Sequence, residues 1–374
     1  MIKLLIGGSP CTYWSCAQKH NRETKADGLG WELFKNYLIA KEKFKPDFFL
    51  YENNKSASQA IKDQIKQELG VWDGSILTED SGARYIEINS ALVSAQNRQR
   101  FYVHNCGEVQ QPIDRGIHIS DILESNVGKP INICANEKSR TIKAQYQQSS
   151  IANFVTNGGH NATGVAQRIP TYGNKEKSRP VKASYANKGA GQGSLKTECF
   201  PESTIKEKSD YIVEPSRGNS GYVYSVKNGL ISISGKEYPI DLVDGYYTIR
   251  KLTVKECCRL QTMPDDYMKS VSVSQGYKGI GNGWTAEVII HILNYALKNV
   301  PKDEEIVVLS MYDGIGTGRY CLDKMGFTNV KYYAYEIDKY AMTVAKDNYP
   351  DIIECGDAFQ VRDNNWSIYC NKEE

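Results

Sequence analysis

The feature that most constrains the fold is an ordered series of patterns late in the sequence. An apolar run at 305–311 leads into a glycine-rich turn at 312–318, a helical pattern at 319–325, and a second apolar run at 331–335 that ends in Glu336. Glycines after a strand let the backbone approach a ligand, and an acid on the next strand accepts hydrogen bonds from ribose hydroxyls. We therefore predict an α/β sheet with a nucleoside-cofactor site.

The glycine spacing narrows the kind of cofactor. The distance along the chain from Gly314 to Glu336 fits the roughly 20 residues expected between the turn and the ribose-binding acid. The turn from Asp313 to Gly318 lacks the Gly-x-Gly-x-x-Gly spacing of dinucleotide sites, and no lysine follows its last glycine. Neither NAD nor a nucleoside triphosphate is therefore expected.

The rest of the chain divides by its hydrophobic periodicity. Strand and helix signals alternate over residues 1–104, with helical patterns at 29–43 and 56–69, and α/β material of this kind returns after 248. Residues 105–247 carry short strand-like runs between Gly, Asn and Ser turns. We therefore predict an α/β domain and a smaller, irregular β-rich domain. The predicted boundaries are 1–104, 105–247, 248–297, a hydrophilic linker at 298–305, and 306–374.

Charge and composition indicate the environment. The apolar runs are strand-sized, and the run at 2–6 is too short for a signal peptide, so we expect no membrane segment and a cytoplasmic protein. The ten cysteines show no paired Cys-x-x-Cys spacing, so we predict reduced thiols and no metal site.

The overall charge of +2 hides a basic segment. Between Lys129 and Thr197 there are eleven basic residues against two acidic ones, which favours a polyanionic partner. A merely solvated surface is the alternative. Two similar stretches, 136–146 and 175–185, each contain Lys-Ser-Arg, and we expect Arg140 and Arg179 to contact phosphates.

Three other segments place reactive side chains near predicted strand ends. Cys11 follows the first strand in a Gly-Gly-Ser-Pro turn, Glu52 and Asn53 end the next strand, and Arg98 and Arg100 precede a third. A thiol beside a carboxylate can serve as a nucleophile with an acid or base. Taken singly, the cysteine is more often structural and the two arginines are more often a solvated basic pair, while Glu52 could be a helix-capping acid.

Together, these segments resemble the cytosine-C5 DNA methyltransferase family. The motifs that carry the resemblance are Gly7-Gly8-Ser9-Pro10-Cys11, Glu52-Asn53-Asn54, Gln96-x-Arg98-x-Arg100, the segment 250–265 (RKLTVKECCRLQTMPD), Gly279-Ile280-Gly281-Asn282-Gly283, Tyr312-Asp313-Gly314-Ile315-Gly316-Thr317-Gly318, Glu336-Ile337-Asp338 and Gly356-Asp357. The resemblance implies a Rossmann-like, S-adenosylmethionine-dependent methyltransferase sheet, with 105–247 as the target-recognition domain.

The order of the motifs departs from the family. The motifs that normally begin such chains come last here, so the chain resembles a circular permutant whose catalytic half is 1–104 and whose cofactor-binding half is 306–374. Asn54 replaces the usual Val, and Thr317 replaces a frequent Gly.

The resemblance also implies a role for each catalytic residue. Cys11 would add to C6 of a cytosine flipped out of the duplex, Glu52 would contact N3 and the exocyclic amine, and Arg98 or Arg100 would hold O2, with Arg98 favoured. The residues expected to contact the substrate are Pro10, Asn53, Gln96, Arg140 and Arg179.

The resemblance implies that S-adenosylmethionine is bound by the motifs at 312–318, 336–338 and 356–357 and by the Gly-Asn motif at 279–283. The expected residues are Tyr312, Asp313, Gly314, Ile315, Gly316, Thr317, Gly318, Glu336, Ile337, Asp357, Ala358, Asn282 and Gly283. Glu336 would hold the ribose, Ile337 would pack on the adenine, and Asp357 would accept from its amine.

Three other functions remain open at this point. The same catalytic residues would serve a tRNA cytosine-C5 methyltransferase, a silent DNA-binding regulator could keep the fold, and a thymidylate-synthase-like enzyme also attacks C6. The length of 105–247 and the intact Cys11, Glu52 and Arg98 favour a methyltransferase that acts on double-stranded DNA in a bacterial or phage-infected cell. A cognate restriction endonuclease is a possible partner, and the target sequence and oligomeric state stay open.

Overall fold

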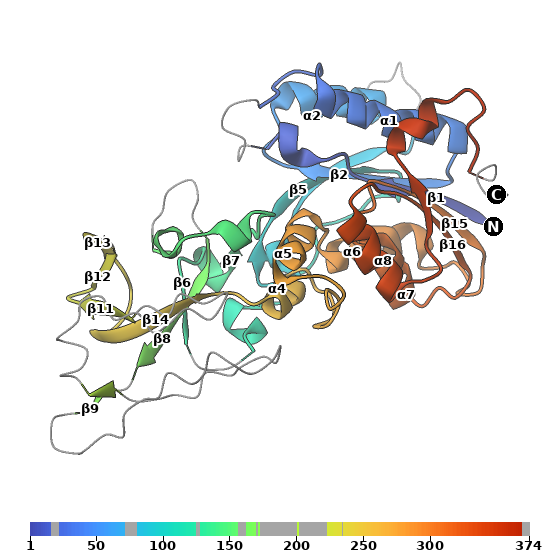
Figure 1. The fold of residues 1–374 in the computed structure, drawn as a ribbon. Coiled ribbons are helices and arrows are strands. Elements are labelled where there is room, and N and C mark those ends of the chain that lie inside the picture. Colours follow the sequence, from blue (N-terminus) through green and yellow to red (C-terminus); the bar gives the residue numbers. More distant parts are fainter. Residues whose placement is uncertain are drawn as a thin grey trace.

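A computed structural model describes residues 1–15, 22–71, 81–124, 128–155, 162–169, 171–172, 200–201, 223–233 and 235–368. It contains a large mixed sheet flanked by helices and, to one side, a second sheet with α4 (Val254–Leu260) and α5 (Val273–Asn282) between the two (Figure 1). The α/β class and the extra β-rich region predicted from the sequence are both confirmed.

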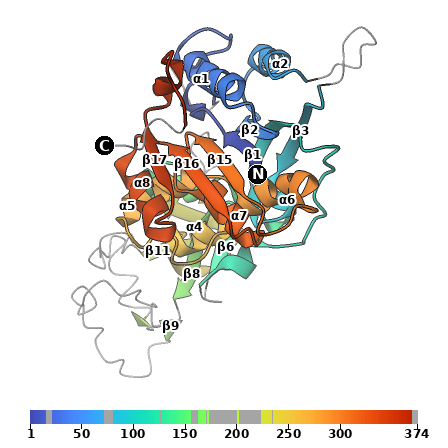
Figure 2. The same ribbon diagram turned by 90° about the vertical axis from the view of Figure 1, so that its right-hand side faces the viewer.

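The main sheet has seven strands in the order β17-β16-β15-β1-β2-β5-β3 (Figure 2). Their bounds are β1 (Ile2–Gly7), β2 (Phe48–Asn54), β3 (Arg84–Asn89), β5 (Gln99–His104), β15 (Ile306–Met311), β16 (Val330–Tyr335) and β17 (Ile353–Gly356). The first five in this order run parallel, and β5 is antiparallel to both β2 and β3. Strands from the two ends of the sequence therefore share one sheet.

Helices cover both faces of this sheet, which explains why its central strands are apolar throughout. Leu5 of β1 packs with α1 (Leu29–Phe44) and α2 (Gln59–Glu68) on one face. Leu4 and Ile6 of the same strand pack on the other face, which is covered by helices that Figure 1 shows below the sheet. These are α6 (Ala286–Leu297), α7 (Thr317–Lys324) and α8 (Lys339–Asn348).

The helices expected at 29–43, 56–69 and 319–325 form within a few residues of these bounds, as α1, α2 and α7. Thr317 and Gly318 belong to α7 rather than to the preceding turn. Among the described residues, no helix is both long enough and apolar enough to cross a membrane.

The second sheet is antiparallel and has the strand order β13-β12-β11-β14-β8-β6. Its strands are β6 (Lys129–Ile131), β8 (Gly164–Ile169), β11 (Val223–Lys227), β12 (Leu230–Ile233), β13 (Lys236–Pro239) and β14 (Gly245–Lys251). Two short pairs accompany it, β4 (Gln96–Asn97) with β7 (Ser139–Arg140) and β9 (Thr171–Tyr172) with β10 (Phe200–Pro201). Buried residues of this sheet and of α4 and α5 form one apolar core.

The segment 250–265 joins this sheet to the main domain through a buried ion pair. Thr253 caps α4, its hydroxyl accepting from the backbone N–H of Glu256, while the Glu256 carboxylate accepts from the backbone N–H of Thr253. The fully buried Glu256 also receives two bonds of 2.8 Å from the Arg250 guanidinium. This arrangement accounts for the spacing of Arg250, Thr253 and Glu256 in the 250–265 motif.

Candidate active site

The topology brings the ends of six strands to one edge of the main sheet. β1, β2, β15, β16 and β17 are parallel, so the segments that follow them emerge on the same side. Since β5 runs the other way, its first residues lie at this edge, with Arg100 opposite Asn54. The Pro-Cys turn, Glu52, the two arginines and the glycine-rich turn therefore meet there, although they lie far apart in the sequence.

The Pro-Cys turn leaves β1 through two glycines that nothing larger could replace. A Cβ on Gly7 would lie 2.5 Å from the carbonyl oxygen of Met311, and one on Gly8 would lie 2.6 Å from that of Glu52. The turn therefore passes directly against both neighbouring strands, and Gly8 lies against the Glu52 carboxylate as well.

A buried polar network fixes the next residue, Ser9. The Ser9 and Tyr51 hydroxyls are 2.8 Å apart, and the Asn53 amide donates to the Ser9 carbonyl at 3.0 Å and to the Tyr51 hydroxyl at 3.1 Å. Asn53, expected to contact substrate, is 1% exposed and holds the turn instead. Exposed Pro10 follows, and Cys11 opens a short 3-10 helix, its side chain being outside the described part of the structure.

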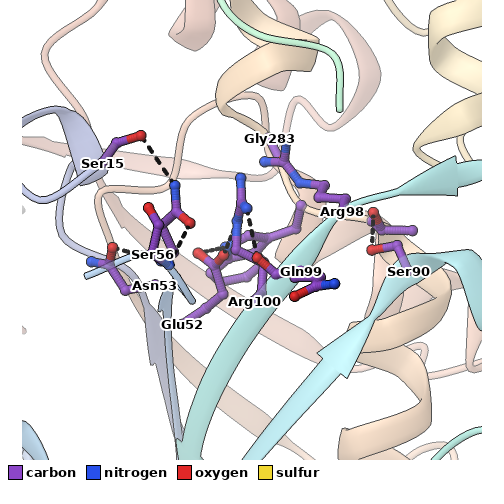
Figure 3. A network of polar contacts seen from close by, with 12 residues as sticks. Ser15, Glu52, Asn53, Ser56, Ser90, Arg98, Gln99, Arg100 and Gly283 are labelled. Atoms are coloured by element: carbon purple, nitrogen blue, oxygen red, sulfur yellow. Dashed lines mark hydrogen bonds and ion pairs between the residues drawn. The ribbon is translucent and has the colours of Figure 1, made fainter. Parts of the chain in front are cut away.

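Both carboxylate oxygens of Glu52 are hydrogen-bonded (Figure 3). Arg100 Nε lies 2.8 Å from Oε1, and Trp284 Nε1 donates to Oε2 at 3.1 Å. Glu52 is only 9% exposed, so this carboxylate is held in a defined orientation at the edge of the sheet. Trp284 was missed by the sequence analysis, although it directly follows the Gly281-Asn282-Gly283 motif.

The two arginines of the Gln-x-Arg-x-Arg motif have separate roles in the structure. Arg98, the favoured base contact, turns toward Gly283, donating to the Gly283 carbonyl at 2.8 Å and the Gly281 carbonyl at 3.3 Å (Figure 3). Gln96, expected to contact substrate, is fully buried, and its amide has no hydrogen-bond partner among the described residues. Arg100, in contrast, is paired with Glu52.

Asn54, the departure from the family pattern, makes contacts that a valine could not. Its Nδ2 donates to the Ser15 hydroxyl at 3.2 Å, and its Oδ1 accepts from the backbone N–H of Ser56 at 3.0 Å. Asn54 therefore links the end of β2 to the segment that follows Cys11.

Glu336 ties together the loops that follow β15 and β16. Its carboxylate accepts from the backbone N–H groups of Gly314 at 2.9 Å and of Ile337 and Asp338 at 2.8 Å. Gly314 has a left-handed φ of 67°, which a side chain would strain. Glu336, the acid predicted from its spacing to Gly314, therefore lies beside the glycine-rich turn.

The remaining expected cofactor residues divide between the core and the surface. Ile315, Thr317 and Ala358 are buried, and the Tyr312 hydroxyl donates to the Leu33 carbonyl of α1 at 2.7 Å. Those at the surface of this edge are Ile337, 72% exposed, Asp357 and Asn282. Ile337 lies between Glu336 and Asp338, so its exposed side chain could pack on an aromatic ring while the neighbouring carboxylates accept hydrogen bonds from donor groups of the same ligand.

Two acids near the glycine-rich turn, Asp313 and Glu354, have buried carboxylate oxygens that accept no hydrogen bond from the described residues. Asp313 accepts from Ser310 and Tyr332 at 2.6 Å, while its Oδ2 and both carboxylate oxygens of Glu354 have no partner among the described residues. Burial, reinforced by the neighbouring Asp313, raises the pKa of Glu354 to about 7. Burial likewise raises the pKa of Asp313 to about 6.

The basic segment makes mostly internal contacts where it is described. Lys129 pairs with Asp241, Lys138 is buried and donates to backbone carbonyls, and Arg168 donates to the Asp244 carbonyl. Arg140 Nε, expected to contact phosphate, donates to Asn132 at 3.0 Å. Arg179 and the second Lys-Ser-Arg stretch lie outside the described residues.

A mostly parallel sheet whose edge joins a glycine-rich turn, an acid after the next strand and a Pro-Cys turn defines a Rossmann-like α/β protein. Residues 1–298 match the family of C-5 cytosine-specific DNA methylases, to which the chain therefore belongs. The chain is 26% identical to the type II methyltransferase M.FnuDI of Fusobacterium nucleatum over 314 residues, 80% of this chain and 78% of the relative.

Two further similarities are more limited. The type II methyltransferase M.HhaI of Haemophilus parahaemolyticus is 33% identical over 87 residues, 22% of this chain and 25% of the relative. A crystal structure of a DNMT2 mutant from Spodoptera frugiperda covers 78% of each chain at 14% identity, with a TM-score of 0.39.

The raised pKa of Glu354 predicts a pH-dependent stability. In the unfolded chain this carboxyl has its ordinary pKa of 4.5. Between about pH 4.5 and 7 the folded state therefore binds more protons than the unfolded state, so the free energy of unfolding decreases as the pH rises through this range. Glu354→Gln should therefore raise the melting temperature at pH 8 and change it little at pH 5. Thermal unfolding at both pH values tests this, with exposed Glu68→Gln as the control. Equal melting temperatures for Glu354→Gln and the wild type at pH 8 would contradict it.

Proposed function

We propose that the protein is a DNA (cytosine-5-)-methyltransferase that transfers methyl from S-adenosylmethionine to C5 of a flipped cytosine. The observation that carries the proposal is the Glu52–Arg100 pair beside the Gly8-Ser9-Pro10-Cys11 turn, on the same sheet edge as the glycine-rich turn. A fixed carboxylate and a cysteine-bearing turn on the same edge as the expected cofactor site support this reaction.

The proposed reaction begins at C6 of the base. The Cys11 thiolate adds to C6, which moves electron density to C5, and a proton or hydrogen bond from Glu52 at N3 relieves the charge that develops on the ring. Arg100 is now the better choice for O2, because it is paired with Glu52 while Arg98 is committed to the turn at Gly281 and Gly283. C5 then takes the methyl group, and the sulfur that carried it leaves as a neutral thioether. C5 loses its proton to water, and the electron pair left behind re-forms the C5–C6 double bond as the Cys11–C6 bond breaks and the thiolate leaves.

S-adenosylmethionine supplies an electrophilic methyl group on a cationic sulfonium. Glu336 would accept hydrogen bonds from the ribose, and Ile337 would lie against the adenine, with Asp357 accepting from its exocyclic amine. The turn from Asp313 to Gly318, together with Asn282 and Gly283, would surround the amino-acid part. Two observations support this placement: Ile337 is exposed, and Asp313 Oδ2 has no hydrogen-bond partner in the part of the chain that the structure describes.

Double-stranded DNA is the proposed substrate, and residues 105–247 are the proposed target-recognition domain. Two relatives are named type II methyltransferases, and the second sheet lies to one side of the main sheet, as a separate reading domain would. A cognate restriction endonuclease fits this class. A tRNA substrate is the alternative, since it would use the same catalytic residues.

The chain is further proposed to be a circular permutant of its family. Two observations support this: β15 pairs with β1 along all six residues, and residues 306–374 lie beyond the family match at 1–298. The test is a rearranged protein in which the chain is cut at residue 302 and residue 374 is joined to residue 1 through a flexible linker. This protein should fold and should bind S-adenosylmethionine with wild-type affinity. A protein that folds but fails to bind it would contradict the permutation.

The function is tested by transfer of labelled methyl from S-adenosylmethionine to mixed-sequence duplex DNA, with bisulfite sequencing of the product. The wild type should produce methylcytosine and reveal its target site, whereas Cys11→Ser should lose more than about 10³-fold in rate because the nucleophile is gone. Cys134→Ser, a partly buried cysteine in the region 105–247, is the matched control. Methylation of tRNA but not of DNA would favour the alternative, and an active Cys11→Ser would contradict the mechanism.

A further inference from the structure

The indole of Trp284 forms a hydrogen bond to the carboxylate oxygen of Glu52 that is not paired with Arg100 Nε. Its Nε1 donates to Glu52 Oε2 at 3.1 Å, while Arg100 Nε lies 2.8 Å from Oε1. A carboxylate held at one oxygen can still turn about its last torsion, since that torsion is broad. Two donors on different oxygens fix its plane.

The number of remaining acceptor sites fits the proposed substrate. An ionised carboxylate has about four lone-pair sites, of which Arg100 and Trp284 use one on each oxygen. One site on each oxygen is left free of the described residues: one can accept from the exocyclic amine of cytosine, and the other can carry the proton that Glu52 donates to N3, which is itself an acceptor. Because an indole N–H can donate but never accept, Trp284 cannot compete with the base for a proton carried by Glu52.

Arg98 sets the position of Trp284 through the backbone. Its guanidinium donates to the carbonyls of Gly281 and Gly283, the residues just before Trp284. From the other side, a Cβ on Gly281 would lie 2.4 Å from the backbone nitrogen of Ala144, so the turn is packed directly on the segment 143–144. The turn at 281–283 is therefore clamped, and the indole leaves it in a fixed direction.

Resting on the function proposed above, we propose that Trp284 is a positioning residue for Glu52, and that Arg98 acts through it by clamping the turn at 281–283. Arg100 touches the base, whereas Trp284 and Arg98 determine where the Glu52 carboxylate meets it. This gives Arg98 a role in the reaction that does not require it to reach the substrate.

The proposal is tested by Trp284→Phe, which keeps an aromatic ring and removes the N–H. On a duplex containing the target site, kcat should fall about 10- to 100-fold, as expected when a reacting group is misplaced. The KM for DNA and the calorimetric Kd for S-adenosylmethionine should change less than about threefold. Trp366→Phe is the matched control, because Trp366 also donates an indole hydrogen bond, to the Tyr335 hydroxyl, and is distant from Glu52 in the sequence and the hydrogen-bond network.

A double-mutant cycle separates positioning from general destabilisation. Arg98→Ala should reproduce the loss in kcat, and Arg98→Ala combined with Trp284→Phe should be no slower than the slower single variant, because both remove the same restraint. Additive losses would overturn the role of Arg98. An unchanged kcat for Trp284→Phe, or a loss confined to the affinity for S-adenosylmethionine, would overturn the role of Trp284. A wild type that transfers no methyl would instead count against the proposed function.

Discussion

The parallel pairing of β1 with β15 is the contact on which the rest of the structure depends. It joins Ile2–Gly7 to Ile306–Met311 along six residues. Through this pairing, the half of the sheet made of β15, β16 and β17 is continuous with the half made of β1, β2, β5 and β3. Without this pairing, each half would expose a row of backbone groups and an apolar strand. With it, the cysteine-bearing turn and the glycine-rich turn leave neighbouring strands and share one edge.

The antiparallel direction of β5 then completes this edge. Because β5 enters where β2 ends, Arg100 can reach diagonally to Glu52, and Arg98 lies one step outside the strand, within reach of the end of α5. The site is therefore an outcome of strand direction as much as of residue type. Hydrogen bonds from Asn53 to Ser9 and from Trp284 to Glu52 restrict the motion of the turn that follows β1 and of the Glu52 carboxylate.

Local patterns predicted the framework but not the contacts that cross it. The apolar runs at 305–311 and 331–335 marked buried strands because such strands are apolar on both faces, and Glu336 was placed correctly beside the glycine-rich turn. The different partners of Arg98 and Arg100 could not be predicted, because Arg98 bonds to the turn at 281–283, nearly two hundred residues away in the sequence. Trp284 carried no signal of its own for the same reason, and the burial of Gln96 and Asn53 follows from strand packing that the motif does not show.

The central claim is that Cys11 forms a bond to C6 of a cytosine oriented by Glu52. The most direct test is a duplex carrying 5-fluorocytosine at the target site, incubated with S-adenosylmethionine, because fluorine at C5 cannot leave as a proton and the adduct should persist. Mass spectrometry of the digested complex should locate the DNA on the peptide that contains Cys11, with the methyl group on the trapped base. An adduct on another cysteine, or turnover of ordinary DNA with no trapped complex at all, would contradict the account.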